Sequence, residues 1–380
     1  MKLDAFAMER LQSVWENRVA WNLSESGVHP LRLEELALDA DERSALLAQE
    51  LGYGQTNGTL ELRAAIAAMY PGAGPDHVQV TNGGSEANCI ALMHLLEPGD
   101  EVVMMVPNYM QAPGLVRGLG ATLRPWPLAG GADQGGWRAD LAALEALVSP
   151  RTKAVFICNP NNPTGARLTA ADLDGICRIA AAHGAWVISD EIYRGAELDS
   201  AETPSAWGRG ERVLVTSGLS KAYGLPGLRI GWAAGPPETV EALWGIHDYT
   251  SIAPGVLSDR LARIALQPAR RAQILARTQG IVRANYPFVK RWIDRRSDLI
   301  THAAPDAGAI VFLRYRHPIN SLRLVERLRD EQSLLLVPGD HFEMDRHLRI
   351  GFGSDPGYLS AALDLLGEFL DALPPPDDAR

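Results

Sequence analysis

The segment SGLSKAYGLPGLRIGW, residues 217–232, places one lysine and one arginine between two predicted strands. Its glycines allow a ligand to approach the backbone closely: Gly218, Gly224, Gly227 and Gly231. Lys221 lies at a strand end among small residues, where a desolvated amine can act as a Schiff-base nucleophile. Alone, the pattern also fits a solvated loop lysine, because most lysines lie on protein surfaces.

Two more polar segments follow predicted strands. In CNPNNPTG, residues 158–165, three asparagines offer amide groups to a ligand, although prolines and a glycine also build plain turns. In SDEIY, residues 189–193, Asp190 and Tyr193 are three positions apart and can converge on one ligand. Asp190 with Glu191 would also suit a metal, but no histidine cluster supports a metal site.

A fourth segment, TNGGSEAN, occupies residues 81–88 and follows a predicted strand. A Gly-Gly turn that opens a helix presents backbone N–H groups and the positive end of the helix dipole, which together suit a phosphate. Ser85 is equally suited to be an ordinary helix cap.

The elements that position these segments alternate between strands and helices. Short apolar runs predict strands at 78–81, 101–106, 154–158, 186–189, 213–217 and 230–233. Helices are predicted at 85–96, 140–148 and 169–183. This α/β alternation predicts a mostly parallel sheet covered by helices on both faces, with ligands bound at the carboxyl ends of the strands.

The pattern changes after Pro236–Pro237. Two long helical stretches are predicted at 238–266 and 270–294, followed by strands at 309–314, 334–337 and 348–352 and helices at 320–331 and 358–373. We therefore predict an N-terminal segment (1–40) that packs with the small domain and a large domain (41–270). A small α+β domain (271–373) and a disordered tail (374–380) complete the division.

The four motifs, in this order, resemble the aminotransferase class I/II family, which are pyridoxal-phosphate enzymes of the aspartate aminotransferase fold, fold type I. The resemblance runs from about Leu51 to Phe352, and Arg229 follows Lys221 by eight positions, as in that family. It implies a PLP-dependent aminotransferase that moves an amino group between an L-amino acid and a 2-oxo acid.

The resemblance also implies roles around the cofactor ring. Lys221 matches the Schiff-base lysine, which also moves the Cα proton of the substrate. Asp190 matches the aspartate that faces the pyridine nitrogen. Tyr193 and Asn162 match the two residues that hydrogen-bond the phenolic oxygen, and Arg229 matches the arginine that binds the phosphate.

Further roles follow from the same resemblance. Gly84 and Ser85 match the phosphate cradle. Tyr109 matches the aromatic residue that stacks on the pyridine ring. Tyr53, in LGYGQTNG, resembles the tyrosine that reaches the phosphate of a neighbouring subunit, which implies a homodimer with shared active sites.

Two substrate contacts are implied as well. Arg349, in HLRIGFG, matches the arginine that binds the substrate α-carboxylate bidentately. Gly27 lies in the segment that passes over the substrate, where its N–H could contact the carboxylate, and Asn162 also faces the substrate.

The chain departs from the family pattern in two places. Gly218 stands where a hydroxyl residue usually binds the phosphate, so either Ser217 or Ser220 supplies the hydroxyl or phosphate binding is weaker. The segment SESGVHPLRLEEL resembles capreomycidine synthase, a relative that cyclises a hydroxylated arginine by elimination and addition. Glu25 in this segment could bind a cationic side chain or simply cap a turn.

Three functions therefore stay open. The first is transamination. The second is another reaction class on the same fold: elimination, replacement with cyclisation, or oxidation, with an arginine-like amino acid as the substrate of a capreomycidine synthase-like enzyme. The third is a non-catalytic binding module, against which Lys221, Asp190 and Arg349 argue, since all three chemical groups are retained.

The composition limits the partners and the cellular location that we expect for this protein. The 380 residues carry a formal net charge of −10, which disfavours nucleic-acid and anionic membrane partners. The three cysteines match no zinc or CxxC spacing, and no apolar run reaches the roughly 18 residues of a membrane span. The charged first residues do not resemble a signal peptide. We expect a cytoplasmic enzyme that binds no metal.

Overall fold

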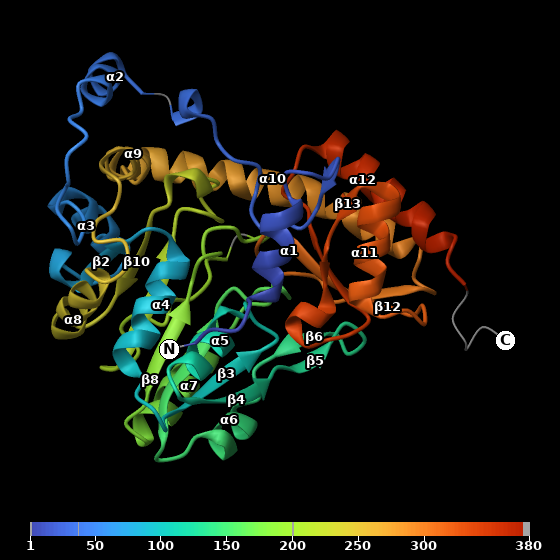
Figure 1. The fold of residues 1–380 in the computed structure, drawn as a ribbon, viewed down its shortest axis with the longest axis horizontal. Coiled ribbons are helices and arrows are strands. Elements are labelled where there is room, and N and C mark those ends of the chain that lie inside the picture. The colour runs from blue at the N-terminus through green and yellow to red at the C-terminus, as the bar shows by residue number, and fades with distance from the viewer. Residues whose placement is uncertain (1, 37, 200, 375–380) are drawn as a thin grey trace.

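The computed structural model describes residues 2–36, 38–199 and 201–374 (Figure 1). The predicted tail, 374–380, lies outside the described residues from residue 375 onward. Among the described residues, no helix is long and apolar enough to cross a membrane.

A seven-stranded sheet forms the centre of the larger part. Its order is β2 (Val78–Thr81), β10 (Gly231–Ala234), β9 (Val213–Gly218), β8 (Trp186–Asp190), β7 (Thr152–Cys158), β3 (Glu101–Val106) and β4 (Thr122–Pro127). Neighbours from β9 to β4 are parallel, whereas β10 is antiparallel to both β2 and β9. The predicted mostly parallel sheet is therefore confirmed.

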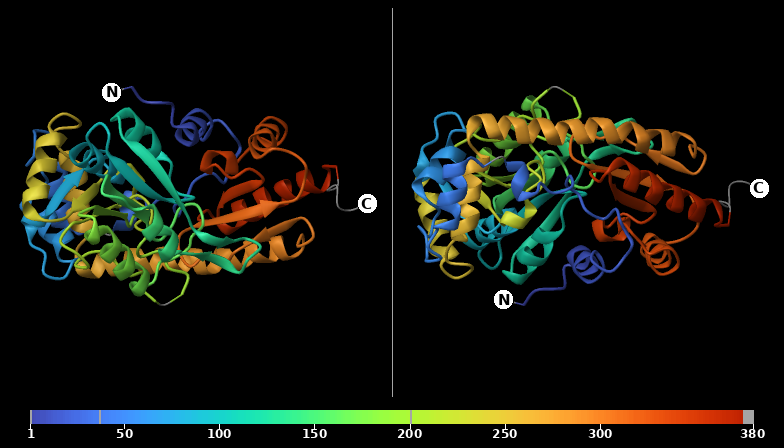
Figure 2. Two further views of the ribbon diagram at one scale, coloured as in Figure 1. Left: turned by 90° about the horizontal axis from the view of Figure 1, so that it is seen from below. Right: turned by 90° about the horizontal axis from the view of Figure 1, so that it is seen from above.

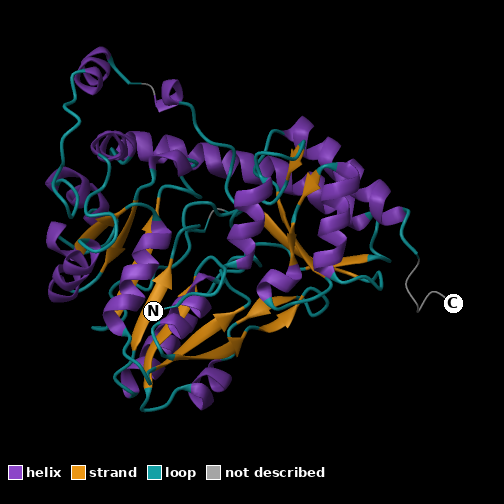
Figure 3. Ribbon diagram, in the orientation of Figure 1, coloured by secondary structure: helices purple, strands orange, loops and turns teal. Residues whose placement is uncertain are grey.

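Helices cover both faces of this sheet (Figure 3). Alternate residues of one strand enter different cores: Val103 and Met105 belong to one core, and Val102 and Met104 to the other. The first core includes residues of α3 (Leu60–Ala67), α6 (Leu141–Leu147), α7 (Ala170–Ala182) and α9 (Val256–Ala265). The second includes residues of α4 (Gly84–Leu95), α5 (Gln111–Gly118) and α8 (Pro237–His247).

A smaller antiparallel sheet has the order β11 (Ile300–His302), β12 (Ile310–Tyr315), β15 (His347–Gly351) and β14 (Val337–Pro338). It shares a core with residues of α10 (Pro268–Asp294), α11 (Ser321–Gln332) and α12 (Pro356–Asp371). β1 (Trp21–Asn22) pairs in parallel with β13 (Leu334–Leu335), so the N-terminal segment joins this smaller part. A hairpin of β5 (Ala129–Gly131) and β6 (Gly136–Arg138) follows β4.

Helix α10 connects the two parts. In both views of Figure 2 it lies along one long edge of the molecule and extends from the large sheet to the small one. Ile274 packs into the core of the large part, and Val282, Val289 and Trp292 pack into the core of the small part. The helix is continuous through residue 270, so the predicted boundary there stays a prediction.

Two sequence predictions need correction, and one strand was missed. The helix predicted at 238–266 is two helices, α8 and α9, because residues 248–255 form a loop in which Ile252 has a left-handed φ of 67° and Pro254 offers no N–H. The strand predicted at 334–337 divides into β13 and β14, which pair with different partners. Strand β4 was not predicted, because its sequence TLRPWP contains two prolines, which only an edge strand tolerates.

The sequence analysis also did not predict the two N-terminal helices. Helix α2 (Ala40–Leu47) has no buried residue, so its sequence lacks a clear apolar stripe. Helix α1 (Ala7–Trp15) does carry apolar residues at helical spacing, Met8, Leu11 and Trp15, but the sequence analysis did not predict it. In Figure 1, α1 lies between the two parts of the molecule, and α2 stands away from the rest at the upper left.

The N-terminal segment after β1 lies directly on the small sheet. The Gly351 N–H donates to the Leu23 carbonyl oxygen at 2.7 Å, and the His29 N–H donates to the Gly353 carbonyl oxygen at 2.8 Å. A Cβ at Gly351 would lie 1.8 Å from the Glu25 carbonyl oxygen, so only glycine allows this approach. Strand β15 therefore holds residues 23–28 against the carboxyl ends of the large sheet.

Candidate active site

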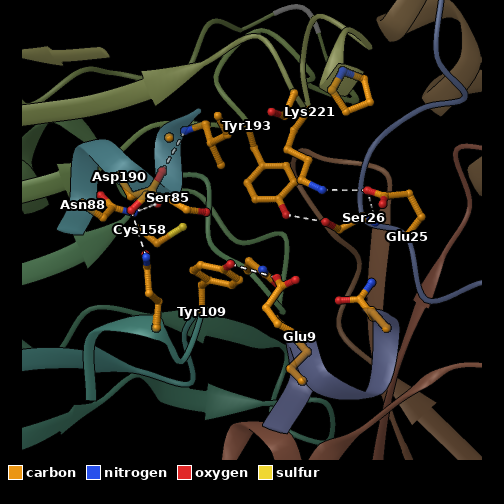
Figure 4. Close-up of a pocket in the computed structure, with 18 of the residues that line it drawn as sticks. Glu9, Glu25, Ser26, Ser85, Asn88, Tyr109, Cys158, Asp190, Tyr193 and Lys221 are labelled. Carbon is orange, nitrogen blue, oxygen red and sulfur yellow. Dashed lines mark hydrogen bonds and ion pairs between the residues drawn. The ribbon is translucent and has the colours of Figure 1, made fainter. Parts of the chain in front are cut away.

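A cavity of about 500 Å³ opens at the carboxyl ends of β7, β8 and β9, beside the start of α4 (Figure 4). Helix α1 and residues 25–26 close another side. The cavity brings together ten residues that the sequence predicted: Gly84, Ser85, Tyr109, Asn162, Asp190, Tyr193, Ser220, Lys221, Arg229 and Arg349. The predicted roles require these residues to lie in one cavity, and they do. The roles themselves stay predictions.

Lys221 follows the end of β9 and forms an ion pair inside the cavity. Its Nζ donates to Glu25 Oε1 at 2.6 Å. Burial lowers the pKa of Lys221, but the neighbouring Glu25 and Tyr193 outweigh burial and leave this pKa above its ordinary value. The amine is therefore charged in this state, and Glu25 is its counter-ion.

Glu25 is held by its own backbone as well as by Lys221. Its Oε1 accepts hydrogen bonds from the N–H groups of Ser26 at 2.8 Å and Gly27 at 3.0 Å. Chiefly because of the Lys221 charge, the pKa of Glu25 falls to about 2. The Gly27 N–H, expected near the substrate, has Glu25 as its partner, and Gly27 is not among the residues that line the cavity.

Asp190 ends β8 and is buried at the floor of the cavity. Asn88 of α4 donates to its Oδ2 at 2.7 Å, and Thr216 in turn donates to Asn88 at 2.5 Å. Burial raises the pKa of Asp190 to about 6, although the Asn88 hydrogen bond opposes this rise. A cationic group beside this carboxylate would restore its ionised form.

The neighbouring Glu191 does not share the cavity with Asp190. Its Oε1 accepts hydrogen bonds from Ser205 at 2.9 Å and from the Ala206 N–H at 2.8 Å. Within the described parts of the chain, no group of three His, Cys, Asp or Glu side chains could hold a metal ion.

The phosphate cradle predicted from TNGGSEAN is formed by three neighbours. Gly83 precedes α4 with a φ of 100°, and no side chain in the described part of the chain caps this helix. A Cβ at Gly83 would lie 2.3 Å from Arg229 Nη2, so the guanidinium packs directly on the turn. The start of α4, Ser85 and Arg229 thus face one end of the cavity, a combination that suits a phosphate.

Close packing explains the glycine at position 218. It pairs with Gly231 across β9 and β10, and a Cβ at Gly218 would lie 2.8 Å from the Ile230 carbonyl oxygen. No side chain fits there without movement of β10. Ser220 lines the cavity and is available as a hydroxyl ligand, whereas Ser217 donates to the Glu191 carbonyl oxygen at 3.2 Å.

Arg349 lies on β15 and is 1% exposed. Its Nη1 donates to Asn162 Oδ1 at 2.9 Å, and its Nη2 donates to the Ser24 carbonyl oxygen at 2.6 Å. Its Nε is buried and has no hydrogen-bond partner among the residues that the structure describes. A buried guanidinium with an unused donor is costly, so the site suits an anionic ligand such as a carboxylate.

Tyr53 lies apart from the cavity, and its side chain is 87% exposed. Its predicted role concerns a second subunit and stays a prediction.

The structure adds residues that the sequence analysis did not identify: Glu9, Gln12, Ser26, Asn88, Gln111 and Cys158. Two of them extend predicted motifs, since Asn88 ends TNGGSEAN and Cys158 begins CNPNNPTG. Glu9 accepts a hydrogen bond from Tyr109 Oη at 2.8 Å across 100 positions of sequence, and no local pattern signals such a contact.

The chain matches the family model "Aminotransferase class I and II" over residues 28–366. It is 34% identical to capreomycidine synthase of Streptomyces vinaceus, over 92% of this chain and 89% of that protein. It is 27% identical to the aspartate/prephenate aminotransferase of Thermus thermophilus, over 96% and 97% of the two chains. The crystal structure of a PLP-dependent aminotransferase from Streptococcus suis 89-1591 superimposes with a TM-score of 0.92 and 32% identity, covering 99% of this chain and 100% of that chain.

The fold, the cradle beside Arg229, the buried Asp190 and the enclosed Lys221 fit one cofactor that has a phosphate, a ring nitrogen and a carbonyl group. With the match over residues 28–366, these observations show that the chain belongs to the aminotransferase class I and II family of pyridoxal phosphate-dependent enzymes.

Proposed function

We propose that this protein is an aminotransferase that moves an amino group between an L-amino acid with a cationic side chain and a 2-oxo acid. The proposed substrate class rests on one observation. Two carboxylates, Glu9 and Glu25, line the cavity together with Arg349.

Pyridoxal phosphate supplies an electron-accepting ring that stabilises negative charge at the substrate Cα. Lys221 is the amine that would hold the cofactor and would move the proton at the substrate Cα. Asp190 would keep the ring nitrogen protonated, because its buried carboxylate would gain a cationic neighbour. Tyr193 and Asn162 would donate hydrogen bonds to the phenolic oxygen.

Arg349 orients the substrate by its α-carboxylate. Its planar guanidinium can form two parallel hydrogen bonds to a carboxylate, which also gives the buried Nε a partner. Since Arg349 comes from the small sheet and Lys221 from the large one, a substrate that contacts both is held between the two parts.

The carboxylates favour a cationic side chain. A Lys221 that holds the cofactor, or acts as a neutral base, would no longer supply the positive charge that Glu25 has beside it here, and a substrate cation could take that place. Among the described residues that line the cavity, the arginines are Arg229 and Arg349, which the phosphate and the α-carboxylate would occupy. A dicarboxylic substrate would thus face like charges at Glu9 and Glu25.

A second function stays open: elimination, replacement or cyclisation on an arginine-like amino acid. The segment around Glu25 favours it, because SESGVHPLRLEEL resembles capreomycidine synthase and the chain is 34% identical to that enzyme from Streptomyces vinaceus. Both functions use Lys221, Asp190 and Arg349 alike, and they differ in whether a 2-oxo acid is needed.

We further propose a homodimer with shared sites. Large apolar side chains near Tyr53 in sequence are strongly exposed in the single chain, including Leu47 and Leu51, and Tyr249 of the loop after α8 is exposed as well. Burying such side chains against a second copy would stabilise the assembly. A cytoplasmic location stays a prediction from the composition.

Reaction class is tested by mixing the holoenzyme with L-arginine alone and following the cofactor absorbance. A transaminase converts its cofactor in one stoichiometric event, and pyruvate or 2-oxoglutarate then restores the original spectrum. Sustained product formation without any oxo acid would contradict transamination and favour the elimination or cyclisation function.

Glu25→Gln tests the substrate class. Glutamine keeps the size and the acceptor oxygen for the Ser26 and Gly27 N–H groups but removes the charge. We expect KM for L-arginine to rise about 10- to 100-fold, the effect of losing a charged hydrogen bond, and KM for L-norleucine to change little. Glu34→Gln is the matched control, because Glu34 is an exposed residue of the same N-terminal segment. Equal losses on both amino acids would contradict cation recognition.

Asp190→Asn tests whether a buried carboxylate lies at this position, through the free energy of unfolding of the cofactor-free protein. Burial raises the pKa of Asp190 from 3.8 to about 6, so its contribution to the stability of the cofactor-free protein is full at low pH and is lost as pH rises through 6. At pH 7 we expect the cofactor-free variant to be more stable than wild type by up to about 3 kcal/mol, with the difference vanishing below pH 4. Denaturant unfolding at several pH values measures this; a difference independent of pH would contradict the burial of an ionised carboxylate. The loaded variant should lose most of its activity.

A further inference from the structure

A hydrogen bond that no motif predicts joins Tyr193 to Ser26. Tyr193 Oη donates to Ser26 Oγ at 2.8 Å across 167 positions of sequence (Figure 4). Both residues line the cavity, and they are 2% and 4% exposed. Since a buried hydroxyl must be paired, this contact fixes where the phenol of Tyr193 lies.

We propose that Ser26 is a positioning residue that holds Tyr193 against the phenolic oxygen of the cofactor and makes its hydroxyl a stronger donor to that oxygen. The inference rests on the proposed role of Tyr193 and is the same for either reaction class.

The chemistry of the two hydroxyls allows this role. A tyrosine hydroxyl has one proton to donate, whereas a serine hydroxyl rotates and can either accept or donate. In the cofactor-free chain Tyr193 donates to Ser26. When Tyr193 turns its proton to the cofactor, Ser26 can donate its own proton to Tyr193 Oη. A hydroxyl that accepts one hydrogen bond donates the next one more strongly.

Contacts with neighbouring residues hold both Ser26 and Tyr193 in place. The Ser26 N–H donates to Glu25 Oε1 at 2.8 Å, and the preceding Leu23 is bonded to β15. Tyr193 follows β8, and its ring packs on Gly308, where a Cβ would lie 3.3 Å from Tyr193 Cδ1. The pair thus links the end of the large sheet to the segment carried by the small sheet.

The charges around Tyr193 leave it protonated. Burial raises its pKa, and the nearby Lys221 and Arg349 oppose that rise only in part. Cys158 also faces the phenol and raises its pKa. The carboxylic acids that line the same cavity are Glu9, Glu25 and Asp190. A neutral phenol is therefore the donor that Ser26 positions.

The test compares reconstituted holoenzymes of wild type, Ser26→Ala, Ser26→Thr, Tyr193→Phe and the double variant. Ser360→Ala is the matched control, because Ser360 is an exposed residue of α12. Two quantities are measured: the pH midpoint of the cofactor absorbance change, and the affinity of the cofactor-free protein for pyridoxal phosphate. Thermal unfolding of each variant shows whether it is folded.

A strongly hydrogen-bonded phenolic oxygen holds the proton of the neighbouring linkage nitrogen less tightly. We therefore expect Ser26→Ala to raise the pH midpoint by about 0.5 to 1 pH unit, the effect of one hydrogen bond, and to weaken cofactor binding severalfold. Ser26→Thr retains the hydroxyl and should restore the wild-type midpoint. In the Tyr193→Phe background, Ser26→Ala should change the midpoint no further, because the pair acts as one unit.

The outcomes separate this inference from the proposed function. A midpoint unchanged in Ser26→Ala, while Tyr193→Phe raises it, would overturn the role of Ser26 alone. A midpoint unchanged in Tyr193→Phe would overturn the proposed role of Tyr193 and, with it, the inference. Equal shifts from Ser26→Ala with and without Tyr193 would show that Ser26 acts by another route and would also overturn the inference.

Discussion

The ion pair between Lys221 and Glu25 is the contact around which the rest of the site is arranged. Its 2.6 Å length requires the end of β9 and the N-terminal segment to meet. That segment is held in place in part by β15, whose Gly351 N–H donates to the Leu23 carbonyl oxygen, and in part by the pairing of β1 with β13. The seven-stranded sheet thus supplies the amine, and the segment held by the four-stranded sheet supplies the counter-charge.

The same arrangement separates the charges of the cavity. Arg229 and the uncapped start of α4 make one end suited to a phosphate, and Arg349 makes another region suited to a carboxylate. Asp190 lies on the floor, where burial makes its negative charge costly until a cation adjoins it. Among the described residues, Arg349 Nε has no hydrogen-bond partner and Asp190 has no cationic one, and a pyridoxal phosphate with an amino-acid substrate would supply these partners.

Residues at strand ends were the predictable part of this molecule. Asp190 ends an apolar strand, Lys221 follows another closely, and the parallel order of those strands brings both residues to one cavity. The local pattern around Lys221 alone also fitted a surface lysine, so its role was predicted from the order of the four motifs, which resembles the aminotransferase family. Ser26 and Glu9 could not be predicted, because their partners lie more than 90 positions away in sequence and depend on how the N-terminal segment crosses the site. The break between α8 and α9 was missed because apolar periodicity continues across the loop that separates them.

The most direct test of the account is to locate the covalently bound cofactor. The chain contains four lysines, and Lys2, Lys153 and Lys290 are exposed, whereas Lys221 alone among them lines the cavity. Borohydride reduction of the holoenzyme, followed by digestion and mass spectrometry of the peptides, should place the cofactor on Lys221 in stoichiometric amount. Stoichiometric attachment to any of the other three lysines would contradict the assignment of this cavity as the active site.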